Sequence, residues 1–285
     1  MAKPVCITAD STCDLSAELV ERFRIRIIPL TITLGENSYP DDGVSVTPEM
    51  LYDFMRAGKG MPQTAAPNVQ DFIDFFQPFL DAGCEIVHLD ISSELSNSFN
   101  AARLAAEELG DGVYVVDSRM LSTGVGLLAI EAAECRDRGE MSAAEIAERL
   151  RSLTGKVETS FVLDTLEFMA KGGRCSNFAA LGANLLKLKP ALEMANGKLG
   201  VYKKYRGSIE HVYREYITER LKGKAVRPGH VFITESGGID GAVIAELEAL
   251  IHSLIPVKEI HHTRAGCTVS THCGPKTLGV LFIDE

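Results

Sequence analysis

The sequence contains no tryptophan, and aromatic residues make up only 7% of its 285 residues. The chain therefore lacks the interleaved aromatic and basic side chains of many nucleic-acid-binding surfaces, and its net charge of -10 also disfavours nucleic acids and anionic membranes as partners. No apolar run is long enough to span a bilayer, and the N-terminus lacks the features of a signal peptide. Seven cysteines without regular spacing are typical of reduced thiols. These absences predict a cytoplasmic protein with no nucleic-acid partner and no stable membrane insertion.

Cofactor motifs are also missing. Metal-type residues gather near the C-terminus without a tight Cys-x-x-Cys spacing: Cys267, His272 and Cys273, with His261 and His262 nearby. Residues 237–241 are rich in glycine but lack the lysine of a phosphate loop and the full dinucleotide spacing. We therefore expect no metal and no cofactor.

The first half of the chain alternates strand and helix patterns. Strands are predicted at residues 5–9, 27–34, 86–91 and 113–116. Helices are predicted at 15–23 with Asp14 as N-cap, from Thr47-Pro48-Glu49 to Gly58, from the Asn68 cap to Leu80, and at 99–109, 121–138 and 142–153. This alternation predicts an α/β fold with a parallel sheet and helices on both faces.

The pattern changes from residue 156 onwards. Strands are predicted at 158–163, 199–205, 231–234, 257–261 and 279–283, and helices at 179–186, 209–221 and 241–254. Asn196-Gly197 suits a type I′ turn, so residues 191–194 and 199–205 should form a hairpin in a mixed sheet. We therefore predict an N-terminal α/β/α domain (1–155), a C-terminal two-layer α/β domain (156–285) and a ligand at their interface.

The motif most suggestive of binding lies between residues 85 and 100. Four serines separate a buried strand from the next helix: Ser92, Ser93, Ser96 and Ser98. Free backbone N–H groups and the positive end of a helix dipole favour an anion at such a turn. Since no lysine or arginine occurs before Arg103, the turn suits a carboxylate or carbonyl better than a polyphosphate. Simple helix capping is the alternative, because serine is a favoured N-cap.

Two further turns carry hydroxyl groups. Residues 62–67 place Thr64 in a stiff turn before Pro67, and residues 9–12 end a strand with an acid and two hydroxyls. All three turns can converge at one edge of a parallel sheet. Capping of each turn's own helix is the alternative, and it is the safer interpretation for Asp10 and Ser11.

Cationic residues occur in three segments of the second half. Residues 171–174 form a glycine turn that carries Arg174, a predicted strand ends near Arg206, and residues 271–276 combine His272 with Lys276. In an acidic chain, such a cluster favours a phosphate or an acidic partner surface. The alternative is that these are solvated charges and that His272 is a satisfied histidine near the core.

The order of these motifs resembles the DegV family, the fatty-acid-binding subunits of bacterial fatty acid kinase. ITADSTCDLSAEL at residues 7–19 resembles the family's opening D-S-T-x-D-L, residues 62–67 its T-S-Q-P turn, and residues 92–101 its S-S-x-L-S-G-T-Y segment. Further matches follow in the same order: Val116-Asp117-Ser118, Lys171-Gly172-Gly173-Arg174, Lys189-Pro190 and residues 271–279. The resemblance extends over nearly the whole chain.

The resemblance implies a long-chain fatty acid ligand with its tail buried in the protein. The two hydroxyls implied for its carboxyl group are those of Thr64 and Ser96, and we add Ser93 as a further candidate. Both Thr64 and Ser96 lie in the turns already singled out for an anion.

The resemblance also implies a partner, an ATP-dependent kinase that phosphorylates the bound carboxyl group so that the acyl phosphate can enter phospholipid synthesis. The residues implied for kinase docking and for the phosphate are Arg174, Arg206 and His272. The chain itself would then be a non-catalytic subunit.

Two other functions stay open at this point. A serine esterase could use Ser96 and His272 with Asp10, and would react with a fluorophosphonate probe, although the chain has no Gly-x-Ser-x-Gly elbow. A protein that binds small phospho-carbonyl compounds would need a small polar pocket, which a hydrophobic tunnel would exclude.

Four positions depart from the family pattern. Ala65 and Ala66 replace a serine and a glutamine in the second turn. Asn97 replaces a glycine after Ser96, and asparagine tolerates a left-handed φ better than most residues. Lys276 replaces a small residue or glutamine, and we expect it to add charge at the mouth of the site.

Overall fold

The computed structural model describes residues 3–172 and 188–285. Its first sheet has four parallel strands in the order β2-β1-β6-β7. These strands are β1 (Val5–Asp10), β2 (Ile25–Ile28), β6 (Glu85–Asp90) and β7 (Val113–Asp117). The prediction of a parallel sheet in the first half is therefore confirmed.

The second sheet has six strands in the order β10-β9-β8-β13-β11-β12. Only β11 and β12 pair in parallel, so the sheet is mixed, as predicted. The predicted hairpin is present, with φ of 53° at Asn196 and 81° at Gly197. The strands are β8 (Val157–Val162), β9 (Lys189–Ala195), β10 (Lys198–Tyr205), β11 (His230–Glu235), β12 (Glu259–Arg264) and β13 (Leu278–Ile283).

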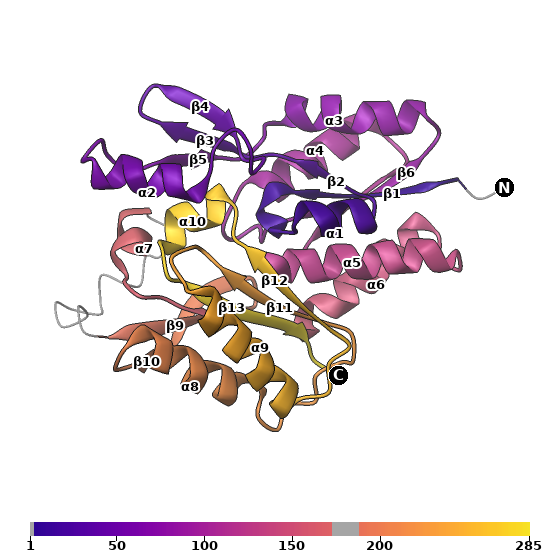
Figure 1. Ribbon diagram of the computed structural model, residues 1–285. Helices are drawn as coiled ribbons and strands as arrows, with labels where there is room; N and C mark the ends of the chain where they lie inside the picture. The colour runs from indigo at the N-terminus through magenta and orange to yellow at the C-terminus, as the bar shows by residue number, and fades with distance from the viewer. Residues whose placement is uncertain (1–2, 173–187) are drawn as a thin grey trace.

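Helices cover both sheets in alternating layers (Figure 1). The first sheet packs between α3 and α4 on one face and α5 and α6 on the other, while α8 and α9 cover the outer face of the second sheet. The bounds of these helices are α3 (Val69–Asp81), α4 (Ser98–Leu109), α5 (Thr123–Arg138), α6 (Ala143–Leu153), α8 (Ile209–Leu221) and α9 (Gly241–Leu254).

Helix α5 lies between the two sheets and joins them. Its sequence is apolar or small on nearly every side, as expected for a helix that is buried all round. A side chain at Gly124 could not fit, since its Cβ would lie 2.2 Å from Thr159 Oγ1 of β8. One hydrophobic core therefore runs from Ile7 of β1 through α5 to Leu281 of β13. A division into domains near Gly155 stays a prediction.

A third, small sheet was not predicted. It contains β3 (Thr31–Leu34), β4 (Asn37–Pro40) and β5 (Gln63–Ala65), in the order β4-β3-β5. The single strand predicted at residues 27–34 is wrong: β2 ends at Ile28, and β3 begins after Pro29 in this other sheet. Proline cannot donate a hydrogen bond to a ladder, so the chain changes direction there.

Most helix starts follow the predicted signals. Asn68 and Ser142 form capping boxes at α3 and α6, and Pro48 opens α2 (Pro48–Arg56). The predicted cap at Asp14 is wrong, because α1 (Ala17–Arg22) is capped by Ser16, while Asp14 follows the short 3₁₀ turn η1 (Ser11–Cys13).

Two elements near the C-terminal motifs also differ from expectation. Residues 171–172 belong to a helix, α7 (Glu167–Gly172), and the rest of the glycine turn predicted at 171–174 lies outside the described residues. His272 lies on a short helix, α10 (Cys267–Cys273), where only a turn was predicted. A second 3₁₀ turn, η2 (Thr154–Lys156), precedes β8, and the helix predicted at 179–186 lies outside the described residues. Among the described helices, none has the length and apolar character needed to cross a membrane.

Candidate functional site

A cavity lies where the two halves of the chain meet. Apolar side chains make up most of its lining. They come from the segment between β2 and β3, the Ser-rich turn, the segment just before α5, and the elements β8, α7, β10 and α10. These apolar residues include Leu30, Ile91, Leu95, Leu121, Phe161, Met169, Leu199 and Val269. No lysine, arginine or carboxylate lines it among the described residues. Such a lining suits a ligand with a long apolar part.

The cavity continues deeper into the protein. A second, narrow space shares Leu121, Phe161, Val269 and Cys273 with the first and extends to Gly279 and Leu281 of β13. Burial raises the pKa of the Cys273 thiol to about 12, so this side chain stays neutral at physiological pH. The second space is less apolar than the first, because Glu235 and several hydroxyl residues also line it: Ser122, Ser160, Thr234, Ser236 and Thr277. The two spaces together form an elongated path between α5, α10 and the second sheet.

Polar groups lie together at one end of this path. Thr64 on β5, Ser96 in the Ser-rich turn and His272 on α10 all line the first cavity. Thr64 Oγ1 lies 3.2 Å from His272 Nε2. Ser96 Oγ accepts a hydrogen bond from Ser98 N at 3.2 Å, which leaves the hydroxyl proton available to donate to a ligand. The structure therefore brings together three residues that are far apart in the sequence.

The four serines of the turn have different surroundings. Ser92 Oγ donates to Gly197 O of the hairpin at 2.7 Å, and Ser93 Oγ donates to Asp117 Oδ2 at 2.6 Å. Ser98 is fully buried at the start of α4. Only Ser96 lines the cavity. Ser93, predicted as a further carboxylate ligand, is directed to Asp117 in this structure.

Asp10 holds the Ser-rich turn in place. Its carboxylate accepts hydrogen bonds from Ile91 N, at 3.1 Å, and from the backbone and side chain of Thr12. Burial, followed by the nearby Asp90, raises the pKa of Asp10 to about 7. Capping was the safer interpretation of Asp10, and it does cap η1, but it also fixes the end of β6 from the neighbouring strand.

Two more acids, missed as positioning residues, hold helix α10. Asp14 accepts from Gly266 N at 2.8 Å and from Ser122 Oγ at 2.5 Å. Asp41 accepts from Cys267 N at 2.8 Å and Thr268 N at 3.0 Å. The two carboxylates thus accept hydrogen bonds from N–H groups at the start of α10, which have no partner within the helix. Helix α10 carries His272. The second acid of the D-S-T-x-D-L motif was a signal for this role, but its partner lies 252 residues away.

Gly172 lies against His272. A side chain at this position would place its Cβ 2.5 Å from His272 Nδ1, so only glycine allows the imidazole its present position. The close approach expected of this glycine-containing segment therefore occurs at Gly172, although it ends a helix. Arg174, in the same motif, lies outside the described residues.

The other predicted cations do not line the cavity. Arg206 is exposed and directly follows β10. Lys276 is exposed, packs beside Gly238, and its N–H donates to Gly237 O at 2.8 Å; its charge at the mouth of the site stays a prediction. Asn97 has φ of −82°, so the turn needs no left-handed residue where the family has glycine.

A Ser–His–Asp triad is not assembled among the described residues. Asp10, its expected third member, is fully buried and bonded to Thr12 and Ile91, as given above. His272 Nε2 has Thr64 as its described hydroxyl partner, not Ser96. The geometry thus gives the esterase interpretation no support.

These features define a two-sheet α/β protein with a hydroxyl-tipped apolar cavity between its halves. Comparison with known proteins agrees: the model of the DegV family, described as uncharacterised proteins, matches residues 4–285. A DegV domain-containing protein from Deinococcus radiodurans is 32% identical over 287 residues, which cover 98% of each chain. The chain belongs to the DegV family.

Solved structures share the whole fold. A structure titled as fatty acid binding of a DegV family protein from Thermus thermophilus is 30% identical, with a TM-score of 0.88 over 99% of this chain and 100% of that one. The Streptococcus pneumoniae fatty acid kinase B3 protein, loaded with linoleic acid, is 23% identical with a TM-score of 0.81 over 100% of both chains. At that identity the likeness shows the fold alone. The α/β fold with one parallel and one mixed sheet, which the sequence predicts, is confirmed.

Proposed function

We propose that this protein binds a long-chain fatty acid, with the tail in the apolar cavity and the carboxyl group between Thr64 and Ser96. The observation that carries the proposal is the mainly apolar first cavity, which has Thr64 and Ser96 in its wall and a further space behind it. The Thermus thermophilus relative, whose title reports fatty acid binding, supports it. A small phospho-carbonyl ligand would leave most of the apolar lining without a partner.

The energetics assign different roles to the two parts of the site. Burial of an acyl chain contributes about 0.8 kcal/mol per methylene, so the tail dominates affinity. Each hydroxyl hydrogen bond adds about 0.5–1.5 kcal/mol. Thr64 and Ser96 therefore orient the carboxyl group, while the cavity selects the tail.

The proposed role extends to a partner. An ATP-dependent kinase would phosphorylate the presented carboxyl group, and the acyl phosphate would supply phospholipid synthesis in the cytoplasm. His272 beside Thr64 would face the transferred phosphate, and Arg174 and Arg206 would contact the kinase. This part rests on the family resemblance and on the lack of a nucleotide-binding motif in the sequence, and it makes the chain a non-catalytic carrier.

Native mass spectrometry of the purified protein, followed by denaturing extraction and lipid analysis, tests the binding proposal. We expect one fatty acid per chain, and its identity would define the preferred tail. A protein that is empty, and stays empty when offered palmitate or oleate, would contradict the proposal. The His230→Gln variant is a suitable comparison, because this residue lies away from the cavity lining.

A further inference from the structure

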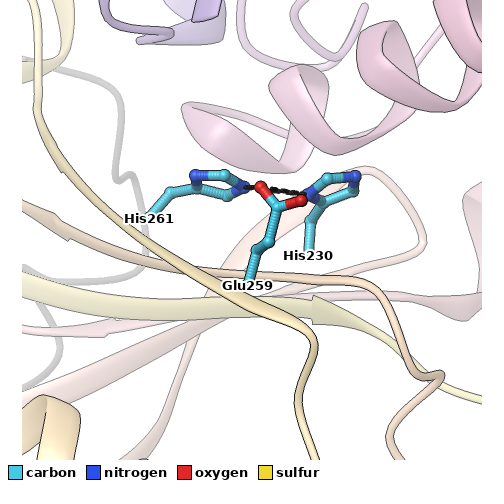
Figure 2. A group of neighbouring side chains, drawn as sticks. All are labelled: His230, Glu259 and His261. Atoms are coloured by element: carbon cyan, nitrogen blue, oxygen red, sulfur yellow. Dashed lines mark hydrogen bonds and ion pairs between the residues drawn. The ribbon is translucent and has the colours of Figure 1, made fainter.

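Three metal-type side chains converge at the end of α5 opposite the cavity. His230 lies on β11, and Glu259 and His261 lie on β12 (Figure 2). His230 pairs with Glu259 and Phe232 pairs with His261 in this parallel ladder. Because alternate residues of a strand share a face, all three side chains project to the face that meets α5. Figure 2 shows the carboxylate of Glu259 between the two rings.

We propose that His230, Glu259 and His261 form a binding site for a divalent transition metal, zinc first among them. Two imidazole nitrogens and one carboxylate oxygen are a ligand set that zinc uses when its fourth position is open. His230 Nδ1 and His261 Nε2 are 2.8 Å apart, and Glu259 Oε2 lies 4.0 Å and 3.7 Å from these two atoms. Tetrahedral ligands at zinc distances are about 3.3 Å apart, so shifts of roughly half an ångström would close the site.

A second carboxylate supports the orientation of His230. Its Nε2 lies 3.2 Å from Glu134 Oε1 on α5. Since an ionised carboxylate only accepts hydrogen bonds, Nε2 carries the proton and the Nδ1 lone pair faces the site. A metal-binding histidine commonly donates its other N–H to a carboxylate, which fixes its ring and increases its basicity.

The other two ligands are also prepared for a metal. Arg22 donates to both oxygens of Glu259, at 2.8 and 2.9 Å, and so fixes the carboxylate plane while each oxygen keeps a further lone pair. Because the Nδ1 of His230 carries a lone pair, the Nε2 of His261 donates the 2.8 Å hydrogen bond between the two rings. Zinc would need only the neutral ring's proton to move from Nε2 to Nδ1.

The surroundings provide access and a structural consequence. Both histidine side chains are 11% exposed, and His230 lines an open cleft that includes Glu134. The metal ligands belong to the second half of the chain, whereas Glu134 and Arg22 belong to the first. A bound metal would therefore strengthen the junction between α1, α5 and the second sheet. The cation Arg22 beside Glu259 should make this site weaker than a four-ligand structural zinc site.

Metal titration of tag-free, chelator-stripped protein tests the proposal. With ZnCl₂ we expect one equivalent bound per chain and a rise in Tm of a few degrees, and with CoCl₂ the visible absorption of a four-coordinate ion. His230→Gln and His261→Gln should each weaken zinc binding by at least tenfold. Glu134→Gln, which alters only the outer partner, should weaken it by about tenfold.

His262→Gln is the matched control. His262 follows His261 but projects to the opposite face, toward Glu235. This variant should bind zinc as the wild type does. The Tm of each metal-free variant, read by circular dichroism, separates loss of a ligand from loss of the fold. No stoichiometric binding, or unchanged binding by a folded variant that lacks both His230 and His261, would overturn the proposal.

Discussion

The two ends of α5 present opposite chemistry at the same junction. At its N-terminal end, Leu121 lines the mainly apolar first cavity, whose wall includes the hydroxyls of Thr64 and Ser96. At its C-terminal end, Glu134 contacts a group of two imidazoles and a carboxylate. The helix rises by roughly 16 Å between its first residue, Thr123, and Glu134. One helix thus supports a site for an uncharged tail and a site for a cation.

The comparison shows that the side chains packed against each end of α5 determine which class of ligand that end can bind. Near the cavity, the side chains that face α5 are large and apolar, such as Phe161. Near the cluster, the face of β11 and β12 that meets α5 carries His230 and His261, and His230 contacts Glu134 of α5. The two sites should therefore fail independently when mutated.

The largest expected effect is loss of fatty acid binding when the cavity is filled. Val269 borders both parts of the path, so Val269→Trp should reduce palmitate affinity by at least 100-fold, measured with a fluorescent fatty acid displaced by palmitate. Zinc binding should stay within twofold. Val44→Trp, at an exposed position, is the control for an added indole. Retained palmitate affinity in a folded Val269→Trp protein would show that the tail lies elsewhere.

A smaller effect is expected when the hydroxyl end of the cavity is altered. Ser96→Ala should weaken fatty acid retention by no more than about tenfold, since one neutral hydrogen bond contributes about 0.5–1.5 kcal/mol. The rate of phosphoryl transfer by a fatty acid kinase should fall by a larger factor than retention, because a misplaced carboxyl group is poorly oriented for the reaction. The acyl phosphate can be trapped as a hydroxamate and counted per bound lipid. Equal, near-complete loss of retention and transfer would contradict the separate roles of tail and carboxyl group.

The sequence predicts the fold better than the site, for physical reasons. Strand and helix periodicities are local, so both sheets, the hairpin and most helices follow from them. The break at Pro29 and the short helix α10 depend on long-range packing, which local patterns do not record. Asp14 shows this limit most clearly. Its local sequence predicts a helix cap, but its carboxylate accepts a hydrogen bond from Gly266 N.

The candidate site could be predicted only in part. The order of motifs led to Thr64, Ser96 and His272, which the structure brings to one cavity. The sequence alone could not distinguish the roles of the four serines. Ser92 bonds to the hairpin, Ser93 bonds to Asp117, and Ser96 lines the cavity, and none of these neighbours is evident from the local sequence. The expectation of no metal considered spacing along the chain, whereas His230 meets His261 across a parallel ladder. Contacts between strands have no fixed sequence separation.

A third prediction concerns the close contact of Gly172 with His272. Gly172→Ala must displace the imidazole, because the added methyl group would lie 2.5 Å from Nδ1. We expect kinase-dependent transfer to fall about fivefold, with palmitate affinity within threefold of wild type. Gly155→Ala is the control, since its Cβ would meet no atom within 4 Å. A Gly172→Ala protein with normal transfer would show that the position of His272 is not critical.

The smallest expected effect is a change in the pH dependence of stability at the other end of α5. Burial and His230 lower the pKa of His261 from 6.5 to about 4, so the unfolded chain binds a proton at pH values where the folded protein does not. The stability that this difference provides is fully present above pH 6.5 and is lost as the pH falls toward 4. Between pH 7 and pH 5 the free energy of unfolding should therefore decrease by about 1–2 kcal/mol more in the wild type than in His261→Gln, measured by urea titration of metal-free protein.

Glu259, whose pKa is lowered to about 2 by its hydrogen bonds from Arg22, adds a separate loss only below about pH 4.5. Parallel slopes in the two proteins would mean that His261 takes up a proton as readily in the folded chain as in the unfolded one, and that its ring is not held neutral for a metal.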